Sequence, residues 1–161
     1  MSKIRHFMEE ALEEARMSLP DDVPVGAVIV RDGQIIARAH NMREKLHSPS
    51  GHAEIIAAEA AAKAIGDWRL QDCDMYVTLE PCPMCAGLLR SARLRNLYFG
   101  AYDPEAGAAG SAMNLLSPAV NVFPLILAGE AEALLKNLFE NMRNKSRKDA
   151  ACRHRAPAGS Q

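Results

Sequence analysis

Apolar residues recur every three or four positions near the start of the chain, and this spacing predicts an amphipathic helix over 4–19. A β-branched run over 23–30 then predicts a strand. Asp32-Gly33 is typical of a tight hairpin turn into a second strand over 34–39. The chain therefore opens with a helix and an antiparallel hairpin. The polar segment 40–50 predicts a loop, where histidines are expected to be solvated.

Helical and extended patterns alternate through the rest of the chain. Gly66 marks the end of one helix, and Pro81 and Pro83 flank the start of another. Pro124 interrupts an apolar run, which therefore predicts only a weak edge strand. The predicted elements are a helix over 52–65, a strand over 74–79, a helix over 82–93, a strand over 96–102, a glycine-rich loop over 103–111, an edge strand over 120–127 and a helix over 134–142.

This order predicts a three-layer α/β/α fold, with a mixed five-stranded sheet flanked by helices. The 161 residues suit one compact domain, which we expect to span 1–149. No apolar run approaches the roughly 18 residues that span a membrane, so no membrane association is expected. The charged, amphipathic start of the chain is unlike a secretory signal, and we expect the protein to be cytoplasmic.

Charge is distributed unevenly along the chain. Six basic residues and Asp149 give +5 over 143–155, whereas the net charge of the chain is −1, so the remainder sums to −6. Residues 150–161 have lost helical periodicity and are expected to form a flexible basic tail. Such a tail is able to contact phosphates, and it is also typical of a solvated chain end.

Two short motifs contain side chains that bind zinc. Cys82 and Cys85 are three apart at a predicted helix start, so both sulfurs lie on one face, and the helix dipole favours the thiolate. His52 adds an imidazole from the start of another helix, and this ligand set suits zinc better than magnesium or calcium. A structural zinc usually has four protein ligands, whereas a catalytic zinc keeps one position for water. A count of three therefore indicates an enzyme.

Glu54 follows His52 by two residues, so its side chain points in a different direction around the helix. Zinc brings the pKa of a bound water down to about 7. A carboxylate beside that water is able to accept its proton and pass the proton to a substrate. We therefore predict that Glu54 is the catalytic acid and base.

Other interpretations of these cysteines remain open at this stage. Cys-x-x-Cys after a strand is also typical of a thioredoxin-like redox pair, but such a pair does not need His52 and Glu54. A structural zinc would need a fourth ligand, such as His47 or Cys73. A zinc-stabilised RNA-binding module without catalysis would use the basic tail and leave Glu54 without a purpose.

His52-Ala53-Glu54 and Pro81-Cys82-Pro83-Met84-Cys85 together resemble the pattern of zinc-dependent nucleobase deaminases. Further segments, at 23–28, 76–87 and 99–111, resemble the bacterial tRNA adenosine deaminases, and the resemblance extends from the first helix to Phe139. It implies a cytidine-deaminase-like fold, a homodimer and one zinc ion per subunit. It also implies that adenosine becomes inosine at the wobble position of a tRNA anticodon arm.

The resemblance also implies roles for single residues. By its pattern, zinc is bound by His52, Cys82 and Cys85, and Glu54 is the proton shuttle. Substrate contacts are implied for Asn41, the Ala53 backbone, Val23 and Asp103.

Several departures from that family lie where RNA would be bound. The segment after Asn121 is about four residues shorter, and Tyr102, Pro104 and Glu105 surround Asp103 in place of basic residues. A paired Phe-Phe is replaced by Leu138-Phe139. A second hypothesis therefore keeps the chemistry but takes a free base or nucleoside, such as guanine or a related aminopurine, as the substrate.

Overall fold

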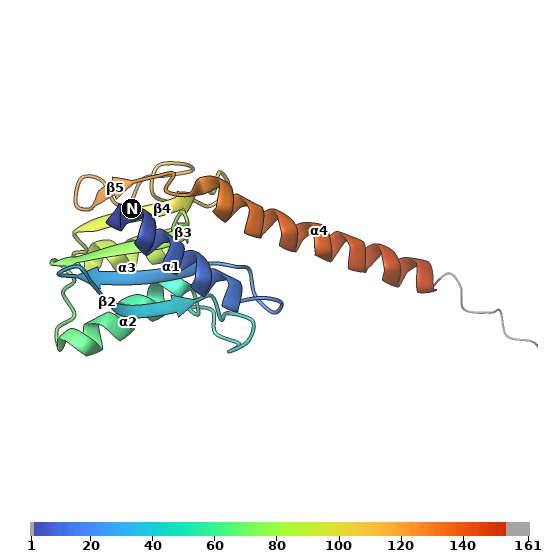
Figure 1. Cartoon of the computed structure of the whole chain (residues 1–161), viewed down its shortest axis with the longest axis horizontal. Helices are drawn as coiled ribbons and strands as arrows, with labels where there is room; N and C mark the ends of the chain where they lie inside the picture. The colour runs from blue at the N-terminus through green and yellow to red at the C-terminus, as the bar shows by residue number, and fades with distance from the viewer. Residues whose placement is uncertain (1, 154–161) are drawn as a thin grey trace, which may run out of the picture.

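A five-stranded sheet forms the centre of the protein, in a computed structural model that describes residues 2–153 (Figure 1). The strand order is β2-β1-β3-β4-β5; β1 is antiparallel to β2 and β3, whereas β3, β4 and β5 are parallel. The predicted mixed five-stranded sheet is confirmed. The elements are α1 Lys3–Met17, β1 Gly26–Arg31, β2 Gln34–His40, α2 Ala53–Ile65, β3 Cys73–Leu79, α3 Pro83–Ser91, β4 Asn96–Ala101, β5 Asn121–Phe123 and α4 Ala128–Arg153.

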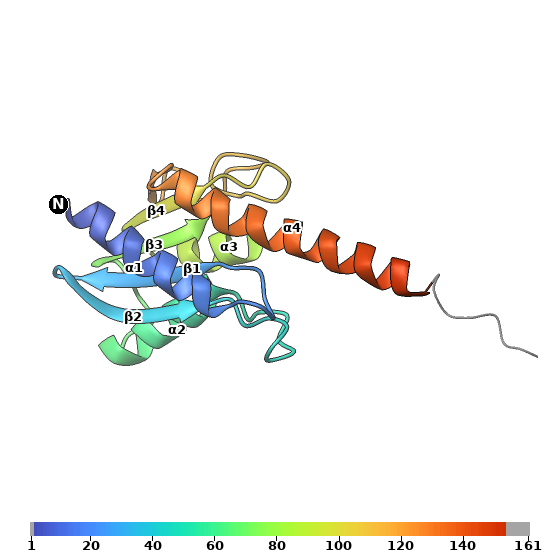
Figure 2. The ribbon, with the colours of Figure 1, turned by 45° about the vertical axis from the view of Figure 1, so that its right-hand side comes forward.

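Helices cover both faces of the sheet, with α1 and the start of α4 on one face and α2 and α3 on the other (Figure 2). Alternate residues of the strands enter the two layers, because successive side chains of a strand point to opposite faces. Ala27 and Ile29 pack toward α2 and α3, whereas Val28 and Val30 pack toward α1. The three-layer α/β/α prediction is therefore confirmed.

Gly26 explains how closely α1 approaches the sheet. A Cβ at this position would lie under 3.0 Å from the carbonyl oxygen of Ala11 and from the backbone nitrogen of Ala15. Only a residue without a side chain fits there. The close contact fixes α1 over β1 and so fixes where the loop between them crosses the end of the sheet.

The turn and cap signals of the sequence have the conformations they predict. Asp32 and Gly33 both have positive φ, at 51° and 73°, as a two-residue type I′ hairpin requires. Gly66 ends α2 in the left-handed conformation, with φ of 77°. The strand predicted from residue 23 begins later, at Gly26, since Val23 and Val25 bond instead to Asn41 at the end of the sheet.

The edge of the sheet is short, as Pro124 predicts. Strand β5 has three residues, and its Phe123 stacks on Tyr98, which stacks on Tyr76, with ring centroids 4.7 and 4.5 Å apart. This aromatic row continues the register of the three parallel strands. It holds a strand that has few backbone hydrogen bonds of its own.

Helix α4 is longer than predicted and projects from the body of the protein (Figure 1). It spans 26 residues to Arg153, and of these only Ala131 is buried. Residues 150–153 are therefore helical, which corrects the flexible tail expected from 150; the remaining residues of that tail, 154–161, lie outside the described part. The extension rests on the helix propensity of residues such as Ala, Lys and Arg rather than on an apolar stripe. None of the helices within 2–153 has both the length and the apolar character of a membrane span.

Candidate active site

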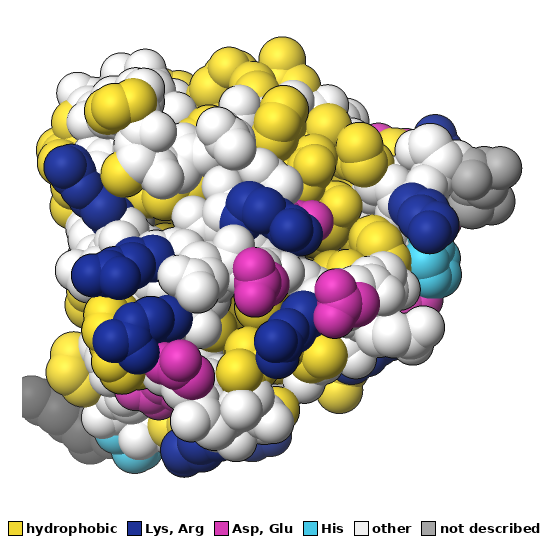
Figure 3. Space-filling view, turned by 90° about the vertical axis from the view of Figure 1, so that its left-hand side faces the viewer, with side chains coloured by type: hydrophobic (Ala, Val, Ile, Leu, Met, Phe, Trp, Pro, Cys, Tyr) yellow, Lys and Arg dark blue, Asp and Glu magenta, His cyan; other side chains and the backbone are white. Residues whose placement is uncertain are grey.

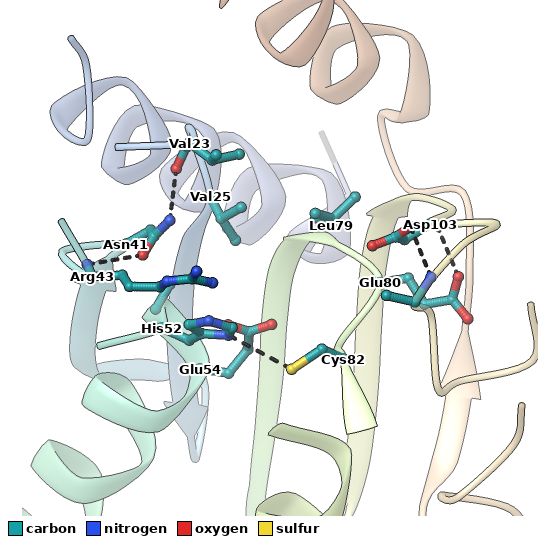
Figure 4. A pocket seen from close by; sticks show the side chains of 12 residues that line it. Val23, Val25, Asn41, Arg43, His52, Glu54, Leu79, Glu80, Cys82 and Asp103 are labelled. Carbon is teal, nitrogen blue, oxygen red and sulfur yellow. Dashed lines mark hydrogen bonds between the residues drawn. The ribbon is translucent and has the colours of Figure 1, made fainter. Parts of the chain in front are cut away.

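The predicted zinc ligands meet where two helices begin, at the carboxyl end of β3 (Figure 4). His52 is the N-cap residue of α2, and Cys82 is the N-cap residue of α3. Cys85 lies in the first turn of α3 and is fully buried. The two helices lie on the same face of the sheet, so their N-termini bring a histidine and two cysteines together from positions 30 residues apart.

The spacing of these three side chains fits a tetrahedral zinc ion. The Nδ1 atom of His52 lies 3.6 Å from Sγ of Cys82 and 3.5 Å from Sγ of Cys85. Typical Zn–S and Zn–N bond lengths at tetrahedral angles place sulfur and nitrogen about 3.6 Å apart. The site is therefore suited to zinc, with His52 ligating through Nδ1 and with Cys82 and Cys85 ligating through sulfur.

The electrostatics of the two cysteines favour a thiolate. A hydrogen bond from Cys85 lowers the pKa of Cys82 to about 5, although partial burial opposes this shift. The same hydrogen bond, together with burial, raises the pKa of Cys85. Cys82 is thus the first thiol to ionise, at the positive end of the α3 dipole.

Glu54 lies in the first turn of α2, beside the ligands, and is 4% exposed. Burial raises its pKa to about 7, against the opposing influence of its backbone hydrogen bond and of His52. Within residues 2–153, one group of His, Cys or acidic side chains has its ligand atoms within 4.8 Å of one another, and it consists of His52, Cys82 and Cys85. Glu54 is therefore positioned to move a proton and is separate from that ligand group.

A structural zinc would need a fourth protein ligand, and neither of the two candidates, His47 and Cys73, lies near the group of three. Cys73 begins β3 at the opposite end of that strand from Cys82, and His47 lies in a different hollow of the surface. A redox pair does not need an imidazole close to both of its sulfurs. The arrangement leaves one tetrahedral position for a water molecule, as in catalytic zinc sites.

A pocket of about 290 Å³ opens over these residues (Figure 4). This volume is at the lower end of the range for small-ligand sites and suits a single base. All four of the predicted substrate-contacting residues line it. Its lining consists of Val23, Val25, Asn41, Arg43, His52, Ala53, Glu54, Leu79, Glu80, Cys82, Asp103 and Ala106.

Asn41 joins two segments that line the pocket, the one before β1 and the loop after β2. Its side-chain Nδ2 donates to the carbonyl oxygen of Val23 at 3.2 Å, and its Oδ1 accepts from the backbone N–H of Arg43 at 3.1 Å. One amide hydrogen and one lone pair therefore remain for a ligand. Asn41 is thus able both to hold this wall in place and to contact a base.

Asp103 follows β4 at the opposite rim. Its Oδ1 accepts from the backbone N–H groups of Glu105 and Ala106, both at 3.2 Å, which leaves Oδ2 for a ligand. Ala53 is fully buried. Because it is the first residue of α2, its backbone N–H has no acceptor within the helix. A purine in this pocket would lie between these donors and acceptors.

Five residues of the pocket lining were missed from the sequence, and two of them, Arg43 and Glu80, are charged. Arg43 extends into the pocket between Val25 and His52, and nothing in its loop context indicated this (Figure 4). Glu80 is 2% exposed, directly before Pro81-Cys82. The signal for Glu80 was present, because a carboxylate that ends a buried strand must find donors, and the glycine-rich loop offers backbone N–H groups.

The expectation that His40 is a solvated loop residue is wrong. His40 is the last residue of β2, and its Nδ1 lies 3.2 Å from Oε2 of Glu14, with the two side chains 18% and 13% exposed. The pair joins α1 to the strand that leads into Asn41. This contact links residues 26 positions apart and has no local sequence pattern.

The fold and the zinc site together define a nucleobase deaminase, and comparison with known proteins agrees. The family model for the cytidine and deoxycytidylate deaminase zinc-binding region matches residues 1–101. The protein belongs to this family of zinc-dependent deaminases.

Within the family, its relatives include deaminases that act on tRNA. The chain is 41% identical to the tRNA-specific adenosine deaminase of Bacillus subtilis over 153 residues, covering 91% of this chain and 95% of that protein. A solved structure of a tRNA:A34 deaminase, from work on A-to-I editing at the wobble position, is 43% identical; it covers 81% of this chain and 99% of its own, with a TM-score of 0.76. Guanine deaminase from Bacillus subtilis is 37% identical, with 66% and 69% coverage and a TM-score of 0.60.

Proposed function

We propose that this protein converts adenosine to inosine at the wobble position of a tRNA anticodon arm. The observation that carries the proposal is the extent of the likeness to tRNA-specific adenosine deaminases. It covers 91% of the chain at 41% identity and so includes the walls of the pocket as well as the zinc motif. Compared as structures, the tRNA:A34 deaminase matches 81% of the chain at 43% identity, whereas the guanine deaminase of Bacillus subtilis matches 66% at 37% identity.

The reaction replaces the amino group at C6 of adenine with oxygen from water and releases ammonia. His52, Cys82 and Cys85 would hold the zinc ion, which when bound would lower the pKa of a coordinated water to near 7 and so supply a nucleophile at neutral pH. Glu54 accepts a proton from the attacking water and delivers it to N1 of the ring. It then takes the second proton of the water, from the new hydroxyl group on C6, and transfers it to the amino nitrogen as the C6–N bond breaks and ammonia leaves.

The other pocket residues orient the base for this reaction. The Ala53 backbone and the free positions on the Asn41 amide hold the purine edge, and the Val23 side chain packs against its face. Asp103 lines the pocket with Oδ2 available, and in this proposal it contacts the sugar of the target nucleotide. Arg43 adds a positive charge beside a ligand that carries phosphates.

An RNA substrate also needs surface beyond the base pocket. A second hollow, of about 630 Å³, shares Val23 with the active-site pocket. Its lining includes Lys45 and His47, Leu138 and Met142 of α4, and the acidic residues Asp21, Asp22 and Glu44, of which Asp22 is bonded to backbone N–H groups. Nucleotides that flank the target would occupy this hollow. Past Met142, α4 has five basic residues and one acidic residue up to Arg153, all exposed, and these are placed to contact the phosphate backbone.

The opposite end of the molecule differs in its charge pattern. Figure 3 shows the end of the sheet away from α4, where basic and acidic side chains lie beside one another. A mixed surface of this kind does not concentrate a polyanion as a basic helix does. The charge distribution thus favours RNA approach from the α4 side.

Deamination of a free base such as guanine is the second candidate, and the similarity to guanine deaminase favours it. The two candidates share the pocket and Glu54, but they differ in their need for α4 and the second hollow. The chemistry at the zinc site is therefore the same for both candidates, and only a substrate comparison separates them.

A screen for ammonia release distinguishes the two candidates. Purified zinc-loaded protein is incubated with anticodon stem-loops that carry adenosine at the wobble position, and with free bases and nucleosides. Inosine in the RNA is measured by mass spectrometry, and stem-loops with guanosine at that position are the control. Inosine formation that falls steeply with salt supports the proposal. Activity on guanine without activity on any stem-loop would overturn it.

We also propose that the protein is a cytoplasmic homodimer, as its similarity to bacterial tRNA adenosine deaminases implies, with residues 1–149 sufficient for deamination. Light scattering after size-exclusion chromatography tests the dimer, and a monomer at micromolar concentration would contradict it. Cell fractionation tests the location. Deamination of the substrate that the screen returns, by a chain that ends at Asp149, tests the domain, and an inactive folded chain would contradict it.

A further inference from the structure

Glu80 is a buried carboxylate for which the zinc chemistry has no use. It stands between the end of β3 and Pro81-Cys82 and is 2% exposed. Each hydrogen bond that its carboxylate accepts comes from the loop that follows β4. Oε2 accepts from the backbone N–H of Asp103 at 2.9 Å and from the hydroxyl of Ser111, and Oε1 accepts from the backbone N–H groups of Ala109 and Ser111 at 3.0 and 2.9 Å.

The backbone beside Glu80 makes one further bond to the end of β4 and one to the same loop. The N–H of Glu80 donates to the carbonyl of Ala101 at 2.8 Å, and the carbonyl of Pro81 accepts from the N–H of Ala108 at 2.8 Å. The loop over 103–111 is thus joined to the segment that leads directly into the zinc ligand Cys82. The loop contains no helix or strand, and its other supports include a β-bridge from Ala109 to Asn114 and the burial of Ala108 in the core.

Gly107 shows how tightly the loop closes around the carboxylate. A Cβ at this position would lie under 3.0 Å from Oε2 and Cδ of Glu80 and from the carbonyl oxygen of Asp103. The φ angle of Gly107 is not in the left-handed region, so the reason for glycine is space. The loop is therefore built to surround this side chain.

We propose that Glu80 is a positioning residue for the substrate. It acts through Asp103 and the loop over 103–111, which form the wall of the pocket opposite Asn41 (Figure 4). The proposal rests on the proposed function, since it gives Asp103 the role of holding the nucleotide outside the base. Glu80 itself does not move a proton in this account, because its oxygens are already occupied by four donors.

A carboxylate is required because all four partners donate. A glutamine at this position would turn one acceptor into an N–H₂ group that faces N–H donors, and those donors would lose their partner. Glu80→Gln keeps the size of the side chain, so the loop loosens while the fold and the zinc ligands stay in place. A displacement of about 1 Å in a substrate-positioning group lowers kcat/KM by about 10- to 100-fold.

The first test compares Glu80→Gln with Glu132→Gln, which changes an exposed carboxylate of α4. Zinc content, melting temperature and steady-state kinetics are measured on the substrate that the screen returns. We expect Glu80→Gln to retain zinc and to raise KM about tenfold or more, with a smaller change in kcat, and Glu132→Gln to match the wild type. A lower melting temperature with unchanged KM would mean that Glu80 only stabilises the fold, and the proposal would be wrong.

A second readout does not depend on catalysis. Hydrogen exchange of the zinc-loaded protein should be faster in Glu80→Gln than in the wild type at the amides of Asp103, Ala109 and Ser111. Unchanged exchange would overturn the proposal even if no substrate were found, whereas an inactive wild type would count against the proposed function alone. Faster exchange without a change in KM would also overturn the positioning role.

Gly107→Ala tests the same contact from the other side. Alone, it should displace the loop and raise KM as Glu80→Gln does. In a Glu80→Ala background, two of the three atoms that the new Cβ would meet are gone and the Asp103 carbonyl oxygen remains, so the added effect of Gly107→Ala should be smaller than in the wild type. Independent effects of the two substitutions would contradict the proposal.

Discussion

Replacing Glu54 with glutamine separates the proton shuttle from the metal site. Glu54 is 4% exposed and lies in the first turn of α2, two residues after the ligand His52. Glutamine has nearly the same size and fits the same buried space. It is unable to accept a proton at neutral pH, so the substitution removes the proposed chemistry and leaves packing and ligands in place.

The magnitude follows from the role. A positioned general acid and base contributes about 10²- to 10⁴-fold to a rate. Each factor of ten corresponds to about 1.4 kcal/mol, so Glu54→Gln should raise the activation free energy by about 3 to 5 kcal/mol. Because Glu54 moves protons in two steps of the reaction, we expect the loss at the upper end of this range. Binding of the substrate should change little, so the loss appears in kcat.

The assay measures ammonia release under single-turnover conditions, with zinc content determined on the same sample. Glu59→Gln is the control, since Glu59 is an exposed residue of the same helix. We expect one zinc per chain in all three proteins and a large loss of rate only in Glu54→Gln. A Glu54→Gln protein with a rate within about tenfold of the wild type would refute the proton-shuttle role.

Other predictions address the metal, the fold and the RNA contacts. Cys82→Ala should release zinc and abolish deamination, which metal analysis and an ammonia assay would show; a variant with full zinc content would contradict the ligand assignment. Gly26→Ala should destabilise the fold by about 1–3 kcal/mol, because its Cβ would overlap the Ala11 carbonyl, and urea unfolding measures this. Arg143→Glu combined with Arg147→Glu should weaken stem-loop binding and lower the slope of log K against log salt by about 1 to 2; unchanged binding would place the RNA elsewhere.

Much of the site was predictable because zinc chemistry depends on residue type and on short spacings. Cys82 and Cys85 share a helix turn, and His52 precedes Glu54 by two residues, so their roles were evident before the fold was known. What the spacing did not contain was the ligating atom of His52. That atom, Nδ1, follows from how α2 and α3 lie against one another.

The pocket wall was less predictable. Glu80 and the loop over 103–111 come together only because β3 and β4 are parallel neighbours, which places the segments after both strands at the same end of the sheet. The contact of His40 with Glu14 likewise requires α1 to cross the hairpin. Neither pair has a local signature in the sequence.

Local periodicity, residue types and short spacings thus determined the type and order of the elements, the hairpin turn at Asp32-Gly33 and the residues suited to bind zinc. These features depend on interactions within a few positions of the chain, which a sequence displays directly. Tertiary structure alone decided which residues enclose the base and why a buried carboxylate precedes the zinc motif. Those features depend on groups that are distant in sequence and become neighbours only when the sheet is assembled.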